Sequence, residues 1–270
     1  MRIRSLTQLA AVAGAGALAA CGGASGDGAT GTAAAADPHP AAATEAKPVA
    51  ARRFSAHVDN PWYPLKPGTV YRFKGEEHGT PTRDVVRVTH RTKLIQGVHA
   101  RVVRDRVLEH GRVVEDTRDW FAQDRAGTVW YFGEDTRELD RHGHTTSTEG
   151  SWQSGRHGAR RGIVMPAHPR VGFSAAQEHF RGHAEDHFKI LAKHASVTVP
   201  YGRFRDRALL TREWTPLEPG VVDHKLYVRG IGMVKERTVK GGDEVGRLVS
   251  DIAPLTRSMR EYPRDAACGC

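Results

Sequence analysis

Three histidines spaced four residues apart, His179, His183 and His187, form the cluster with the clearest metal-binding chemistry, and Glu185 and Asp186 lie within it. On a helix this spacing stacks the side chains about 6 Å apart on one face, which suits shared coordination of Zn²⁺ or Cu²⁺. On a strand, successive histidines are about 13 Å apart at 3.3 Å per residue and cannot chelate one ion. The alternatives are therefore a zinc or copper site, or solvated surface histidines with no metal cofactor.

Tryptophans beside carboxylates suggest a second kind of site, chiefly at Asp119 with Trp120 and at Glu213 with Trp214. Aromatic faces beside acids bind sugars or cations, and two carboxylates about 5–10 Å apart can serve as general acid and base in a glycan or wall-polymer hydrolase. On a strand, however, neighbours point to opposite faces, so we expect each Trp to enter the core and its acid to face water. The four residues are candidates for ligand binding, and catalytic residues stay unassigned.

The common catalytic motifs are missing from the sequence. Ser151 lies in Gly-Ser-Trp-Gln-Ser-Gly, which is not the Gly-x-Ser-x-Gly elbow of hydrolases. The pair Gly230 and Gly232 lacks the third glycine of a dinucleotide site, and His183 to His187 is not a His-Glu-x-x-His motif. We therefore favour a binding protein over an enzyme.

The elements that must position these residues are short strands. Runs rich in β-branched and aromatic residues, separated by glycine turns, predict strands at 70–73, 85–90, 100–108, 113–121, 128–132, 196–199, 204–211, 222–228, 232–239 and 244–252. In 222–228, Val222, Leu226 and Val228 are expected to face the core, and Asp223 and Lys225 to face water.

Two further segments carry weaker patterns. Residues 150–172 are rich in Gly, Arg and Pro and predict a long loop. Residues 174–195 begin with a capping box typical of a helix, but Gly182 interrupts it and favours two strands. The sequence thus predicts a mainly β fold: a single domain, residues 54–256, whose curved antiparallel sheet forms a barrel, half-barrel or sandwich. Such sheets often enclose a ligand cavity.

The N-terminus directs the chain out of the cytoplasm. Arg2 and Arg4 precede an apolar stretch that ends in Leu18-Ala19-Ala20-Cys21, which predicts a signal peptide over residues 1–20. The segment resembles a bacterial lipobox, and this resemblance implies a lipid-anchored, extracytoplasmic lipoprotein acylated at Cys21. Residues 21–53, rich in Ala, Gly and Thr, predict a flexible linker, and 257–270, with Cys268 and Cys270, a C-terminal tail.

The charge of the chain narrows its partners. The formal net charge is +9, and +7 without Arg2 and Arg4 of the signal. The basic residues are scattered among 31 acidic ones instead of forming a stripe, so we exclude nucleic acid as a partner. Membrane lipid, an envelope polymer or a small molecule remain as candidate partners.

Three segments resemble the signatures of an uncharacterised family of exported bacterial proteins and lipoproteins. They are Asp59–Gly68 (DNPWYPLKPG), Asp119–Asp124 (DWFAQD) and Glu213–Gly220 (EWTPLEPG). The resemblance covers residues 54–252; it implies one β-rich module in the bacterial cell envelope and assigns no catalytic residue. The sequence therefore predicts a membrane-anchored lipoprotein that binds a ligand or partner, with an envelope metal-binding protein and a hydrolase as the alternatives.

Overall fold

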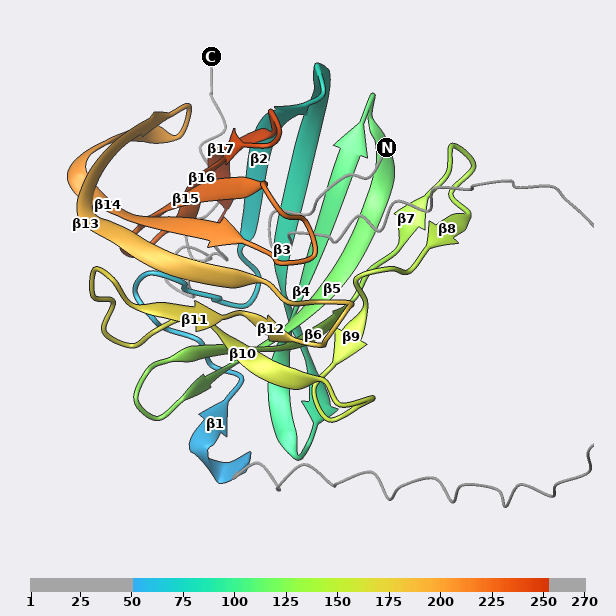
Figure 1. Cartoon of the computed structure of the whole chain (residues 1–270), viewed down its shortest axis with the longest axis vertical. Coiled ribbons are helices and arrows are strands. Elements are labelled where there is room, and N and C mark those ends of the chain that lie inside the picture. Colours follow the sequence, from blue (N-terminus) through green and yellow to red (C-terminus); the bar gives the residue numbers. More distant parts are fainter. Residues whose placement is uncertain (1–50, 253–270) are drawn as a thin grey trace, which may run out of the picture.

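The structure is a computed structural model that describes residues 51–252, and nearly all of this part is β-sheet (Figure 1). A 3-10 turn, η1 (Ala51–Arg53), comes first. The strands are β1 (Phe54–Ser55), β2 (Val70–Glu77), β3 (Thr80–Ile95), β4 (Val98–Glu109), β5 (Arg112–Asp124), β6 (Val129–Asp135), β7 (Glu138–Leu139), β8 (Thr145–Ser147), β9 (Trp152–Gln153), β10 (Arg160–Met165), β11 (Ser174–Ala176), β12 (Glu178–His179), β13 (His187–Val199), β14 (Gly202–Trp214), β15 (Val222–Val228), β16 (Gly232–Lys240) and β17 (Val245–Ile252). The predicted signal peptide, Cys21, most of the linker, and the tail with Cys268 and Cys270 lie outside the described residues.

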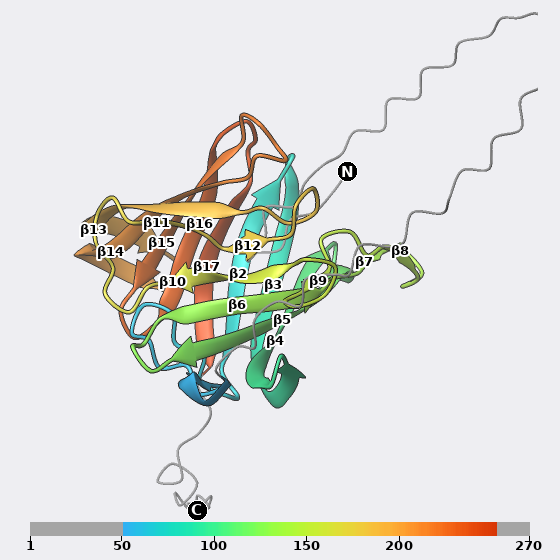
Figure 2. The same cartoon turned by 60° about the horizontal axis from the view of Figure 1, so that its bottom comes forward.

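The strands form one antiparallel sheet that nearly closes into a barrel. Strands β2 to β6 pair in sequence order, and so do β13 to β17, while β17 pairs with β2 to join the two groups. On the other side β10 pairs with β6 and with β12, and β11 pairs with β13 (Figures 1 and 2). The predicted fold class is therefore confirmed, with the barrel as the form that the sheet approaches.

The hairpins β2–β3, β3–β4 and β4–β5 turn through two residues that both have positive φ, namely His78 with Gly79, Gln96 with Gly97, and His110 with Gly111. Positive φ at both central positions is the mark of a type I′ turn, whose twist matches that of paired strands. The second position is glycine each time, because glycine adopts this conformation without a steric penalty. These turns fix the strand register, and they confirm the glycine turns that the sequence predicts between these strands.

The prediction of a long loop over 150–172 was wrong. Strands β9 and β10 lie within it, and Ile163 of β10 is opposite Trp130 of β6. The apolar run of β10 is short and flanked by Gly and Arg, so it carries little periodicity. For residues 174–195 the favoured prediction of strands is confirmed, with a tight turn between Phe180 and Ala184.

One end of the barrel is covered by the segment between β1 and β2. Val58, Trp62 and Leu65 of this segment belong to the main core. Asn60 donates its amide hydrogens to the carbonyls of Gly127 (2.8 Å) and Pro166 (3.2 Å), in the loops after β5 and β10. The backbone N–H of Gly230, after β15, bonds to Pro61. We call residues 56–69 the end segment, because they join three loops at one end of the sheet.

The main core fills the barrel with apolar side chains from nearly every long strand, including Val88, Phe121, Phe188, Leu209 and Tyr227. A smaller cluster packs on the outer face of β4 to β6, where Phe54 contacts Phe132. The described part of the chain has no helix long and apolar enough to span a lipid bilayer.

Candidate functional site

The interior of the barrel holds an unusual number of buried acids. Among residues 51–252, eleven carboxyl side chains are buried, whereas Lys225 is the only buried lysine or arginine. The acids are Glu77, Asp84, Asp105, Glu115, Asp119, Glu134, Glu178, Asp186, Glu213, Asp223 and Glu236. Burying a charge is costly unless it is paired or neutralised, so these groups must share protons and counter-charges.

Tyr131 links two of these acids. Its hydroxyl lies 2.7 Å from Asp119 Oδ1 and 2.7 Å from Glu134 Oε2, and Asp119 and Glu134 are directly opposite each other on β5 and β6. The hydroxyl has one hydrogen to donate, so one carboxyl must carry a proton and donate to the tyrosine oxygen. Burial, together with nearby Glu178 and Asp119, raises the pKa of Glu134 well above its ordinary value. We therefore assign the proton to Glu134.

Glu178 continues this network on the far side of Tyr131. Its Oε1 accepts a hydrogen bond of 3.1 Å from Trp152 Nε1. Burial raises the pKa of Glu178 to about 8, partly opposed by the bond from Trp152, and nearby Asp119 raises it further. At neutral pH this carboxyl is therefore mainly protonated.

Lys225 forms the second polar centre of the interior. Its Nζ lies 3.0 Å from Glu213 Oε2 and 3.5 Å from Glu236 Oε1. Burial alone would lower the pKa of Lys225, but Glu213 and Glu236 outweigh it and raise that pKa well above its ordinary value. The hydroxyls of Thr211 (2.9 Å) and Tyr227 (3.3 Å) both donate to Glu213 Oε1, which fixes the carboxylate in place.

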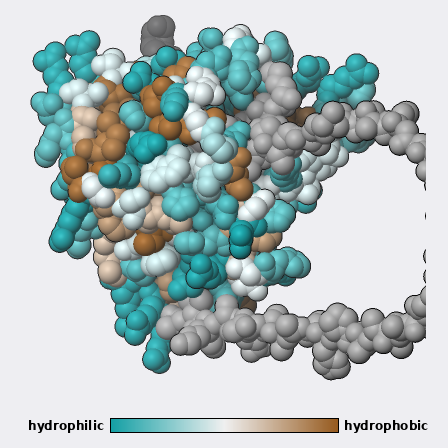
Figure 3. Space-filling model, in the orientation of Figure 1, coloured by the Kyte–Doolittle hydropathy of each residue, from teal (hydrophilic) through white to brown (hydrophobic). Residues whose placement is uncertain are grey.

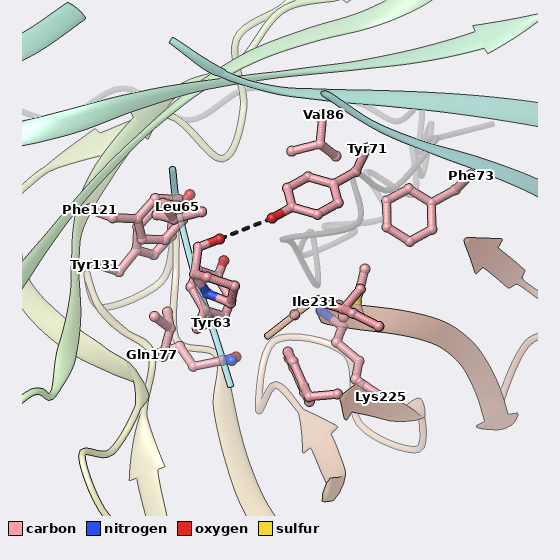
Figure 4. A pocket seen from close by; sticks show the side chains of 15 residues that line it. Tyr63, Leu65, Tyr71, Phe73, Val86, Phe121, Tyr131, Gln177, Lys225 and Ile231 are labelled. Carbon is pink, nitrogen blue, oxygen red and sulfur yellow. Dashed lines mark hydrogen bonds between the residues drawn. The ribbon is translucent and has the colours of Figure 1, made fainter. Parts of the chain in front are cut away.

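A cavity lies between these polar groups and the end segment (Figure 4). The cavity has a volume of about 70 Å³, which is enough for several water molecules or one small group of a ligand. Its walls are mostly aromatic and aliphatic, with the polar ends of Gln177 and Lys225 among them. The hydroxyl of Tyr71 donates to the carbonyl of Pro64 (3.1 Å), which ties the end segment to β2 across the cavity wall. The lining residues are Tyr63, Pro64, Leu65, Tyr71, Phe73, Val86, Phe121, Tyr131, Val164, Gln177, Lys225, Tyr227, Ile231, Gly232 and Met233.

The predicted Trp and acid pairs are split between the two faces of the sheet, and both acids are buried inside the barrel instead of facing water. Asp119 and Glu213 are buried inside, where both raise the pKa of Tyr63, after the larger effect of its burial. Trp120 packs in the outer cluster under Lys93, whose Nζ lies 3.3 Å from the ring centre. Trp214 is also outside, beside Arg212. The two acids share one interior, but neither tryptophan joins them.

Strand β15 shows the same departure from the prediction. Lys225, predicted to face water, points inward and lies among the cavity-lining residues, and Asp223 is buried as well. Leu226 and Val228 on the other face are also buried, so both faces of this strand are covered. The prediction that Leu226 and Val228 face the core is confirmed, because they pack in a core cluster with Phe73, Val234 and Leu248. The prediction that Asp223 and Lys225 face water was wrong.

The histidine cluster is distributed over a hairpin. His179 is on β12, His183 is in the following turn and stacks on Phe180 (4.3 Å between ring centres), and His187 is on β13 and stacks on Trp214 (5.7 Å). Glu185 accepts a bond from His187 through its backbone carbonyl, and Asp186 is buried. Among residues 51–252, no group of three or more His, Cys, Asp or Glu side chains is arranged to hold a metal ion.

Three interior residues were missed at the level of sequence: Tyr131, Glu178 and Lys225. Glutamate and lysine usually face water, and Tyr131 lies in an apolar run, so the residue types gave no signal of a buried polar role. The available clue was the number of acids at alternate positions, as in Glu115, Thr117 and Asp119 of β5, since this pattern places polar groups on one face.

The three signature segments meet around the cavity. Gln123 of the second accepts the backbone N–H groups of Asp59 (3.0 Å) and Asn60 (2.8 Å) of the first, and donates to Asp59 Oδ1 (2.6 Å). Tyr63 of the first and Phe121 of the second line the cavity, with ring centres 5.5 Å apart. Glu213 of the third holds Lys225.

No protein-family model matches the sequence, and no curated protein matches it. One similar solved structure is a presumed exported protein with a YmcC-like fold from Bacteroides fragilis, with 11% identity over 71% of this chain and 98% of the other, at a TM-score of 0.41. A second is a presumed lipoprotein from Parabacteroides distasonis, with 11% identity, the same coverages and a TM-score of 0.38.

Proposed function

We propose that this chain is an extracytoplasmic lipoprotein, anchored in the bacterial membrane through acylated Cys21, which binds a small, uncharged and mainly apolar ligand inside its barrel. The observation that carries the proposal is the cavity at the meeting point of two signature segments, with the third segment holding Lys225 at its wall. The anchor rests on the sequence of the N-terminus, since Cys21 lies outside the described residues.

The chemistry of the walls selects the ligand. The cavity is lined chiefly by rings and aliphatic side chains, and Lys225 at its wall is already neutralised by Glu213 and Glu236. An anionic ligand would have to compete with these carboxylates for Lys225. A cationic ligand would lose its hydration without finding a free carboxylate on the lining. The end of an acyl chain or a single neutral aromatic ring, with one polar atom near Gln177, fits best.

Cavity-filling substitution tests the proposal. Val86 lies on β3 and lines the cavity, so Val86→Trp places an indole in the space that the ligand would use. The control is Val239→Trp, because Val239 is exposed on β16 and lies outside the cavity lining. Binding is measured on the mature chain by the fluorescence increase of N-phenyl-1-naphthylamine, an uncharged apolar probe.

We expect saturable binding by the wild type and by Val239→Trp, and at least a tenfold weaker affinity for Val86→Trp. Mass spectrometry of extracts from chain purified out of its own envelope should then show an uncharged apolar compound that Val86→Trp no longer retains. Equal affinities for the two variants, or no saturable binding by the wild type, would overturn the proposal.

A further inference from the structure

A second hollow lies on the outside of the molecule, at the end covered by the end segment. It is a groove with a volume of about 740 Å³, formed by the end segment, the loops after β5 and β10, and the bent middle of β13 and β14. The bend comes from irregular pairing, since the register between β13 and β14 shifts between Ile190 and Val197. The lining residues are Asp59, Asn60, Pro61, Trp62, Gln123, Ala126, Gly127, Ala167, His168, Pro169, Arg170, Lys193, His194, Asp206, Arg207 and Arg229.

The basic side chains of this groove lack acidic partners among the described residues. Within residues 51–252, Arg170, Lys193, Arg207 and Arg229 form no ion pair, and Arg229 instead lies over the ring of Trp62, 5.5 Å from its centre. His168 and His194 add two more groups that become cationic on protonation.

The two acids of the groove contact neutral side chains or a histidine instead of its four Arg and Lys residues. Asp59 accepts from Gln123 (2.6 Å) and lies 3.5 Å from His57, and Asp206 accepts from Ser196 (3.3 Å). The groove therefore carries four positive side chains against two negative ones, and no ion pair joins them in the part of the chain that the structure describes, so its excess of positive charge favours an anionic partner.

Exposed aliphatic side chains lie at the same end of the barrel. Val171 follows Arg170 and is 62% exposed, and Leu94, before the β3–β4 turn, is 61% exposed; they are the two most exposed large hydrophobic residues described. Hydrophobic residues also gather beside the bent part of β13 and β14 on the face shown in Figure 3, whose surface is otherwise mainly hydrophilic. Apolar side chains beside unpaired cations are typical of surfaces that rest on anionic membranes.

The polypeptide leaves the described domain beside this groove. Phe54 pairs with Asp124, and the N–H of Arg125 bonds to the carbonyl of Arg53 (3.1 Å). Ala126 and Gly127, which follow directly, line the groove. The route toward the predicted lipid anchor at Cys21 therefore starts at the cationic end of the molecule.

We propose that this groove and its rim bind the phosphate headgroups of anionic phospholipids in the membrane that carries the predicted anchor, with Leu94 and Val171 entering the headgroup layer. A basic residue near an anionic bilayer strengthens binding about fivefold, so four of them give a substantial attraction. A tether of about 30 residues keeps the domain at high local concentration near the lipid, so that modest affinity suffices.

Vesicle sedimentation tests this proposal without the acyl chains. The mature chain carrying Cys21→Ser is mixed with phosphatidylcholine vesicles that contain 30% phosphatidylglycerol or none, at 0.1 M and 0.5 M salt. We expect binding only to the anionic vesicles, weakened at high salt. The triple variant Arg170→Gln, Lys193→Gln, Arg207→Gln should bind about 100-fold more weakly. All three side chains are exposed, so its thermal unfolding should match that of the parent.

The matched control removes the same charge at the opposite end of the barrel. Lys74→Gln, Arg83→Gln, Arg112→Gln changes three exposed residues near the β2–β3 and β4–β5 turns and should bind as the parent does. Replacing Leu94 and Val171 by serine should weaken binding but leave its salt dependence unchanged. Equal losses in the two triple variants, equal binding to neutral vesicles, or binding to soluble polyphosphate but not to vesicles would overturn the proposal.

Discussion

Lys225 provides the counter-charge for two of the buried acids. The residue is 3% exposed, and its ammonium group contacts two glutamates from the neighbouring strands β14 and β16. The directly opposite residue on β16 is Glu236 itself, so the pairing of the strands sets the ion pair. Without the lysine, two buried carboxylates would face each other with no counter-charge between them.

Replacing this lysine should therefore destabilise the domain strongly. For Lys225→Met we expect a loss of about 3–5 kcal/mol in the free energy of unfolding at pH 7, because removing one partner leaves the others buried and uncompensated. Urea unfolding measures the loss, and Lys240→Met, at an exposed position on the same strand as Glu236, is the control. Burial is the main cause of the raised pKa of Glu236. At lower pH Glu236 should therefore take up a proton, and part of the lost stability should return. Similar urea midpoints for the two variants would contradict this role.

At the scale of single residues, the sequence predicted which acids matter but not where they point. Asp119 and Glu213 were chosen because of the tryptophans beside them, yet these tryptophans pack on the outer face. Trp120 is buried, but in the outer cluster with Phe132, while its neighbour Asp119 is buried on the inner face. The expectation that the acid of such a pair faces water fails, because the outer face of β5 has its own cover from Phe54 and neighbouring residues.

At the scale of elements, the closure of the barrel depends on the short strands β10, β11 and β12. Arg161 of β10 is paired with Glu178 of β12, and Gly162 follows directly. A Cβ on Gly162 would lie 2.2 Å from the carbonyl oxygen of Gln177 and 2.5 Å from that of Ala176. Only glycine lets these backbones approach so closely.

Gly162→Ala should accordingly separate β10 from its neighbours and lower the stability of the closed sheet. We expect the free energy of unfolding to fall by at least about 2 kcal/mol and the amide hydrogens of β10 and β12 to exchange faster. The control is Gly202→Ala, because its added Cβ meets only Phe204, at an ordinary 3.4 Å. Hydrogen exchange followed by mass spectrometry distinguishes the two, and unchanged protection of β10 in Gly162→Ala would refute the prediction.

The elements themselves were largely predictable. Long strands with clear turns, such as Val222–Val228, were placed correctly because their patterning and turn glycines agree. Strand β10 was not, since its pairing with β6 and β12 joins residues that are distant in sequence, and short strands depend on such tertiary contacts more than on local propensity. The sequence alone therefore could not predict how β10, β11 and β12 close the barrel.

For the whole molecule, the sum of these buried acids predicts an unusual pH dependence of stability. Burial raises the pKa of Asp84, Glu115, Glu134 and Glu236 well above ordinary values, and that of Glu178 to about 8. Between the unfolded and the folded pKa, the folded state binds more protons than the unfolded state, so the free energy of unfolding falls as pH rises. We expect thermal stability to be greater near pH 5 than at pH 8.

Glu178→Gln should flatten this dependence. The amide keeps an oxygen acceptor for Trp152 but has no proton to lose. Each tenfold difference in proton affinity between the folded and the unfolded state contributes about 1.4 kcal/mol to the free energy of unfolding. The loss of stability between pH 5 and 8 should therefore shrink by several kcal/mol. Glu76→Gln, at an exposed position of β2, should leave the pH profile unchanged. Thermal unfolding across this range provides the measurement, and a Glu178→Gln profile parallel to that of the wild type would show that this carboxyl does not titrate as proposed.

The pairing of β2 with β17 has a consequence for the order of events in folding. Val70 of β2 is opposite Ile252 of β17, so the sheet joins residues that are among the first and the last of the described chain. Contacts this distant in sequence form late and slowly, because a long loop must close before they contribute. Until residue 252 has emerged from the ribosome or from a translocation channel, β2 and β16 each keep an unpaired edge that invites aggregation. A stalled or truncated chain should therefore need protection by chaperones that the complete chain no longer requires.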